Sequence, residues 1–144
     1  VITRAIAMVE ETRPLLPGVK DAIALCKAQG LKVGLASASP LHMLEKVLAM
    51  FDLRESFDAL ASAEKLPYSK PHPQVYIDCA AKLGVDPLCC VALEDSVNGM
   101  VASKAARMRS IVVPDKEVRH DPRYILADVR LNSLTELTLT DLCG

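Results

Sequence analysis

The amino-acid sequence predicts an α/β fold with a doubly wound, parallel sheet. Short apolar segments bounded by turn residues alternate along the chain with segments whose apolar side chains recur at helical spacing. This alternation is typical of parallel βαβ units. The length of 144 residues matches one domain, and a composition of 51% hydrophobic and 24% charged residues is that of an ordinary globular protein.

The N-terminal half of the chain predicts two helices, then a strand, then a third helix. The first helix is indicated by apolar side chains at Ile2, Ile6 and Val9. The second begins near Val19 and ends at Gly30, a residue type that commonly terminates helices. The four predicted segments are residues 1–12, 19–30, 31–36 and 40–51.

The C-terminal half continues the alternation. A strand at Phe57–Ala63 precedes a long loop, and Pro73 opens a helix that ends at Gly84. A continuous apolar strand, Cys90–Leu93, is followed by Ser96, which can cap the next helix. The remaining predicted elements are a strand at 110–113 and a short helix that begins at the capping box of residues 133–136.

Charge and hydropathy exclude two classes of partner. The net charge of -1 lacks the basic excess of a nucleic-acid-binding domain. No apolar run approaches the ~20 residues that a membrane-spanning helix needs, and no signal-peptide pattern is present. We therefore expect neither a nucleic acid nor a membrane as partner, and a cytoplasmic location; we expect the complete protein to be a monomer. The five cysteines form no C-x-x-C pair and are expected to be reduced.

Three successive strands are each followed by residues suited to phosphate chemistry. Ser37 follows the strand at 31–36, and Lys70 lies in the loop after the next strand. Glu94 and Asp95 follow the third strand. We expect these side chains to meet in the crevice beyond the carboxyl ends of the strands. Carboxylate oxygens suit Mg²⁺, while a hydroxyl, turn amides and a lysine suit a phosphoryl group.

Each of these residues also has a purely structural interpretation. Ser37 can be a polar strand end, Lys70 a solvated loop lysine, and residues 94–96 an ordinary helix N-terminus. The combination favours function, because all three sets follow successive strands of one sheet. Nucleotide-binding classes have less support, since the sequence contains neither G-x-G-x-x-G nor G-x-x-x-x-G-K-[ST].

At these positions the sequence resembles the haloacid dehalogenase superfamily of phosphotransferases. Residues 33–39, V-G-L-A-S-A-S, look like its second motif, an apolar strand that ends in Ser or Thr. Residues 69–73, S-K-P-H-P, look like the third motif, and residues 93–99, L-E-D-S-V-N-G, look like the fourth. Within the superfamily the chain looks most like bacterial sugar-phosphate phosphatases with a helical cap, in the branch of hexitol and 2-deoxyglucose-6-phosphate phosphatases.

The resemblance implies hydrolysis of a small phosphorylated sugar through a covalent aspartyl-phosphate, with Mg²⁺ as cofactor. By motif, Ser37 and the Ala38 amide would hold the transferring phosphoryl group. Lys70 would bridge that group and the nucleophilic carboxylate. Asp95 would bind Mg²⁺, with Glu94 as a second acid that ligates it directly or through water.

The resemblance also implies two weaker assignments and one motif that the sequence lacks. Ser39 and His42 would lie nearer to the leaving group of the substrate. A D-x-D motif should supply the nucleophile ahead of the cap, and the 144 residues contain no D-x-D. The expected organisation is the last helix of a cap domain at residues 1–13 and a core at residues 14–144. This core would lack its central first strand, and most of the cap would be missing.

The chain on its own is expected to be an inactive fragment that folds poorly. Without a central strand, the two halves of the sheet would face each other across a gap with unpaired edges. Two other functions stay open for the complete protein. A phosphosugar mutase of the same superfamily shares all three motifs, and a non-catalytic α/β module can keep a phosphate or Mg²⁺ pocket for binding.

Overall fold

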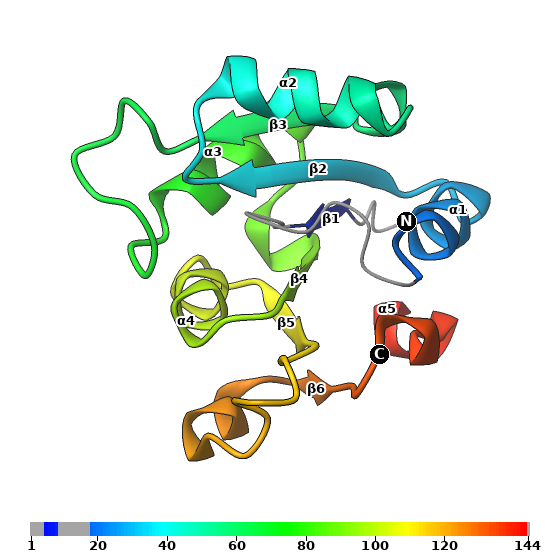
Figure 1. Cartoon of the computed structure of the whole chain (residues 1–144), viewed down its shortest axis with the longest axis vertical. Helices are drawn as coiled ribbons and strands as arrows, with labels where there is room; N and C mark the ends of the chain where they lie inside the picture. The colour runs from blue at the N-terminus through cyan, green and yellow to red at the C-terminus, as the bar shows by residue number, and fades with distance from the viewer. Residues whose placement is uncertain (1–4, 9–17, 144) are drawn as a thin grey trace.

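The computed structural model describes residues 5–8 and 18–143, which form a six-stranded parallel sheet with helices on both faces (Figure 1). The strands are β1 (Ala5–Met8), β2 (Lys32–Ser37), β3 (Ala59–Ser62), β4 (Cys90–Glu94), β5 (Arg109–Val112) and β6 (Val129–Arg130). The helices are α1 (Val19–Ala28), α2 (Leu41–Met50), α3 (Gln74–Leu83), α4 (Val97–Ala105) and α5 (Leu139–Cys143). The 3₁₀ segments are η1 (Arg54–Ser56), η2 (Pro87–Cys89), η3 (Pro122–Leu126) and η4 (Leu134–Glu136). The strand order β3-β2-β1-β4-β5-β6 confirms the predicted doubly wound fold.

Strand β1 is the main difference from the sequence-based expectation. Ala5–Met8 pair in parallel with β2 on one side and with β4 on the other, so the central position of the sheet is filled. The prediction of a cap helix and of a missing central strand is therefore wrong for these residues; the rest of residues 1–13 lies outside the described residues. A four-residue apolar run is compatible with a helix or a buried strand. The backbone groups of β2 and β4, which need hydrogen-bond partners, favour the strand.

Side chains of β2 alternate in size between the two faces of the sheet. Val33 and Leu35 pack in a core cluster with α1 and α2, while Ala36 packs in a second cluster with α3. The same alternation continues in the neighbouring strands. Large residues there face the first cluster (Leu60, Val91, Leu93), and small ones face the second (Ala59, Ala61, Ala92). Figure 1 shows α3 and α4 on one side of the sheet and α1 and α5 on the other.

The predicted helix boundaries depend on residues that the structure places as caps. Ser96 caps α4, with its Oγ accepting the backbone N–H of Gly99 at 3.0 Å. Gly84 ends α3 in the left-handed region at a φ of 71°. The capping box at Ser133 and Glu136 is confirmed, although it opens the 3₁₀ turn η4 and α5 follows only afterwards. Within the described ranges, no helix has both the length and the apolar character needed to cross a bilayer.

Gly34 in β2 lies in close contact with α3. A Cβ at this position would lie 2.7 Å from Cys79 Sγ and 3.0 Å from Leu83 Cδ1, both on α3. We predict that Gly34→Ala lowers the free energy of unfolding by about 1–3 kcal/mol, the usual cost of overpacking, in urea denaturation. Cys79→Ala removes the sulfur, so the double variant should be less destabilised than the sum of the two single variants. Strictly additive losses would contradict this packing.

Candidate functional site

A cavity of about 480 Å³ lies beyond the carboxyl ends of the strands. The segments that line it follow β2, β3, β4 and β5, which is where the sequence predicts a ligand site. The lining residues are Ala38, Ser69, Lys70, Ser96, Val97, Asn98 and Arg123. Hydroxyl, amide and cationic groups therefore surround a space large enough for a small phosphorylated metabolite.

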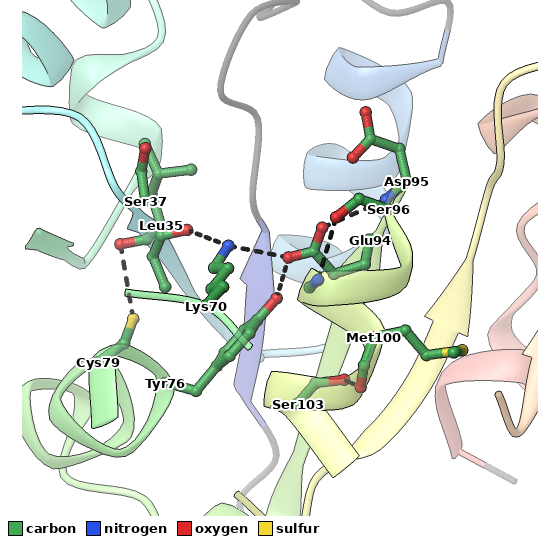
Figure 2. A network of polar contacts seen from close by, with 12 residues as sticks. Leu35, Ser37, Lys70, Tyr76, Cys79, Glu94, Asp95, Ser96, Met100 and Ser103 are labelled. Atoms are coloured by element: carbon green, nitrogen blue, oxygen red, sulfur yellow. Dashed lines mark hydrogen bonds and ion pairs between the residues drawn. The ribbon is translucent and has the colours of Figure 1, made fainter. Parts of the chain in front are cut away.

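Lys70 connects the two strands that flank β1 (Figure 2). Its Nζ donates to the Ala36 carbonyl in β2 at 3.1 Å and to Glu94 Oε2 in β4 at 2.9 Å. The side chains of Lys70 and Glu94 are 5% and 1% exposed, so this ion pair is buried. The ammonium is thereby held in one position at the wall of the cavity.

The Glu94 carboxylate accepts hydrogen bonds from three groups. Besides Lys70, the Tyr76 hydroxyl donates to Oε2 at 2.6 Å, and the Asp95 backbone N–H donates to Oε1 at 3.3 Å. Burial raises the pKa of Glu94, while the Lys70 ammonium and the Tyr76 hydroxyl act to lower it. A distance of 2.6 Å is typical of an O–H group donating to an ionised carboxylate. Glu94 is thus the centre of a buried polar network.

Tyr76, which sequence reasoning missed, and Gly99, the last residue of the fourth motif, shape the surroundings of this carboxylate. Tyr76 lies on α3 and is fully buried. Burial and the Glu94 charge raise its pKa well above the usual value, so its hydroxyl stays protonated and can donate. Gly99 lies in the first turn of α4, where a Cβ would overlap the Glu94 carboxylate. The signal available for Tyr76 was its place on an apolar helix face, because a buried tyrosine hydroxyl needs a hydrogen-bond partner.

Ser37 fixes the shape of the turn that follows β2. It is fully buried, and its Oγ accepts the backbone N–H of Ser39 at 3.1 Å. The Ser62 hydroxyl donates to the Ser39 carbonyl at 2.6 Å, and the Ala63 amide donates to the Ser37 carbonyl at 2.8 Å. The turn is therefore anchored to the end of β3. It brings Ala38 to the cavity, whereas Ser37 and Ser39 are not among the lining residues.

Two predicted site residues, His42 and Asp95, are not among the residues that line the cavity. His42 is exposed in the first turn of α2 and does not line the cavity. Asp95 is half-buried between β4 and α4, and its backbone carbonyl accepts the Tyr124 hydroxyl at 2.9 Å. Figure 2 shows the Asp95 carboxylate turned away from Glu94 and Lys70. The network thus separates the two adjacent acids.

The donor set at the end of β4 fits a Mg²⁺ ion. Within the described part of the chain, no three His, Cys, Asp or Glu side chains gather into a complete protein cage for a metal. Mg²⁺ needs no such cage, because it keeps several waters and uses only one or two carboxylates. Glu94 Oε2 already accepts hydrogen bonds from Lys70 and Tyr76, which reduces its capacity to ligate a cation.

Comparison with known families and proteins supports this view of the fold. A family model for haloacid dehalogenase-like hydrolases matches residues 2–107. The chain belongs to the haloacid dehalogenase-like hydrolases. It is 83% identical to hexitol phosphatase B of Escherichia coli K12 over all 144 residues, and these residues span 65% of the length of that protein. The family membership indicated by the three motifs is confirmed.

Solved structures of other haloacid dehalogenase-like hydrolases share the doubly wound core. CbbY from Rhodobacter sphaeroides, crystallised with xylulose-(1,5)bisphosphate, matches with a TM-score of 0.80 and 37% identity, over 89% of this chain and 58% of that one. A β-phosphoglucomutase from Clostridium difficile matches with a TM-score of 0.76 and 30% identity, over 88% of this chain and 53% of that one. The chain therefore spans little more than half the length of these structural relatives.

The Tyr76 hydroxyl provides the first test of the network. We predict that Tyr76→Phe lowers the free energy of unfolding by about 1.5–3 kcal/mol, because a buried carboxylate loses a donor. Tyr124→Phe is the matched control: Tyr124 is also buried, but its hydroxyl donates to a neutral carbonyl, so a loss of about 0.5–1.5 kcal/mol is expected. Chemical denaturation measures both. A smaller loss for Tyr76→Phe than for the control would contradict an ionised Glu94.

Proposed function

We propose that the natural protein containing this chain hydrolyses hexose or hexitol phosphate monoesters. The observation that carries the proposal is the buried ammonium of Lys70, held by Ala36 and Glu94 at the wall of a cavity lined by hydroxyl and amide groups. The 83% identity to hexitol phosphatase B supports the substrate class. We propose a cytoplasmic location as well, because the four cysteines with described side chains are free thiols, as is usual in reducing compartments.

Lys70 would stabilise the charge on the phosphoryl group during transfer. An ammonium that is already fixed needs no reorganisation when the charge develops, which is the basis of electrostatic catalysis. The turn anchored by Ser37 would present the Ala38 side of the cavity to the phosphoryl oxygens. Asp95 would hold Mg²⁺, which when bound supplies positive charge to those oxygens. Ser39 and His42 remain proposed for the region of the leaving group.

The covalent aspartyl-phosphate route is part of the same proposal. The sequence contains no D-x-D, and none of the described residues lining the cavity is a carboxylate. We therefore propose that the nucleophilic aspartate is not among these 144 residues and that residues 1–144 alone do not turn over a phosphate ester. We likewise propose that the complete protein has a helical cap domain.

A phosphosugar mutase is the second candidate function. It is favoured by the β-phosphoglucomutase from Clostridium difficile, which shares the fold at 30% identity. The products distinguish the candidates, because a phosphatase releases inorganic phosphate and a mutase returns an isomeric sugar phosphate. A non-catalytic phosphate-binding module would do neither.

Lys70 provides the direct test of the catalytic proposal. In the full-length natural protein, Lys70→Met should lower kcat for phosphate release by about 10²–10³ or more, because a preorganised charge is lost. Lys70→Arg should restore little, since a planar guanidinium does not place its charge where an ammonium lies. Lys65→Met is the control, an exposed lysine in the same loop. Near-normal turnover by Lys70→Met would refute the catalytic role.

The two adjacent acids are expected to differ in metal binding. Asp95→Asn in the full-length protein should weaken Mg²⁺ binding at least tenfold by calorimetry, because a neutral amide is a poor ligand for a hard cation. Glu94→Gln should weaken it less, since Glu94 is engaged by Lys70 and Tyr76. The exposed residue Asp52 offers a matched control, Asp52→Asn, in which Mg²⁺ affinity should not change. Unaltered affinity in Asp95→Asn would rule out ligation by this residue.

A further inference from the structure

Arg123 lines the same cavity as Lys70 but comes from a different part of the sheet. It is the second residue of η3, which follows β5, whereas Lys70 follows β3. Asn98, exposed in the first turn of α4, is also in the lining. The cavity therefore has a second cationic side chain for which the three sequence motifs give no role.

Asp121 fixes the guanidinium of Arg123. Nε donates to Asp121 Oδ1 at 3.0 Å, and Nη2 donates to Oδ2 at 2.6 Å. The same carboxylate accepts the Arg123 backbone N–H at 2.9 Å. These bonds from Arg123 lower the pKa of Asp121 to about 2, so the acid is ionised at any working pH. These hydrogen bonds to Asp121 matter because the Arg123 side chain is 67% exposed and would otherwise be free to change conformation.

The next residue, Tyr124, fixes the backbone of η3. It is 1% exposed and packs in a cluster with Met100 of α4 and Val112 of β5. Its hydroxyl donates to the carbonyl of Asp95, directly after β4, at 2.9 Å. The segment that carries Arg123 is thus attached to the strand end that carries Glu94 and Asp95. Arg123 is preorganised from both sides, which reduces the entropy lost when it binds a ligand.

The pairing of Arg123 with Asp121 decides which chemical groups it can recognise. The pair is neutral overall, so it attracts a second phosphate only weakly. It places N–H donors beside carboxylate acceptors, and Nη1 donates to no partner among the described residues. A hydroxyl group both donates and accepts, so adjacent hydroxyls of a sugar or polyol fit such a pair. Asn98 offers a further amide of the same dual character.

We propose that Arg123 is a specificity-determining residue that binds hydroxyl groups of the sugar or polyol part of the substrate. The phosphoryl group lies at the Lys70 end of the cavity. This inference rests on the proposed function, because it divides one substrate between two ends of one cavity. Arg123, which belongs to the core of the protein, thereby binds a part of the substrate that does not react.

The test compares a substrate that has hydroxyl groups with one that has none. In the full-length protein, Arg123→Gln should raise KM for a hexitol 6-phosphate about tenfold or more, the usual effect of losing a hydrogen bond to a charged group, with kcat within about twofold. Both constants for p-nitrophenyl phosphate should stay unchanged. Asp121→Asn, which frees the guanidinium, should change KM in the same direction by less. Arg54→Gln is the surface control, because Arg54 pairs with Glu45 and does not line the cavity.

Other outcomes overturn the proposal. An equal rise in KM for both substrates would mean that Arg123 acts on the phosphoryl group. A rise confined to a sugar bisphosphate would mean that it binds a second phosphate. If the wild type hydrolyses neither substrate, the proposed function fails, and calorimetry with hexitol 6-phosphate then decides the role of Arg123. Binding weakened about tenfold in Arg123→Gln supports that role, and equal binding refutes it.

Discussion

Removing an ammonium and a carboxylate from water costs several kcal/mol per ion, and their mutual attraction offsets this only when other hydrogen bonds complete the pair. Lys70 and Glu94 meet that condition. The Ala36 carbonyl accepts a second bond from the ammonium, and Tyr76 and Asp95 donate to the carboxylate. Each partner comes from a different element, so the pair forms only when β2, α3 and β4 are all in place.

The same constraint explains how a site of few residues is held rigid. Lys70 belongs to a loop, and loops are ordinarily the mobile parts of a domain. Here the loop is attached through the Lys70 side chain to the two strands beside β1. Gly99 allows α4 to approach the carboxylate closely, and the capping hydroxyl of Ser96 fixes where that helix starts. The position of the ammonium is therefore determined by the sheet.

The order of strands and helices could be predicted because it depends on local patterns of apolar and turn residues. The neighbourhood of Lys70 and Glu94 followed as well, because parallel strands direct their carboxyl ends to one edge. The central strand could not be predicted, because Ala5–Met8 are all apolar and fit a helix or a strand equally well. Only the pairing with β2 and β4, which are distant in sequence, favours the strand. Tyr76 was missed for a related reason: its partner is 18 positions away in sequence and in another element.

The small side chains on the α3 side of the sheet also determine where the Tyr76 hydroxyl lies. Gly34 and the alanines beside it set how deeply α3 sits, and α3 carries Tyr76. Any residue that pushed this helix outward would also draw the tyrosine hydroxyl away from Glu94. Larger side chains in that layer would therefore destabilise the packing of α3 and also disturb the hydrogen bonds of Glu94.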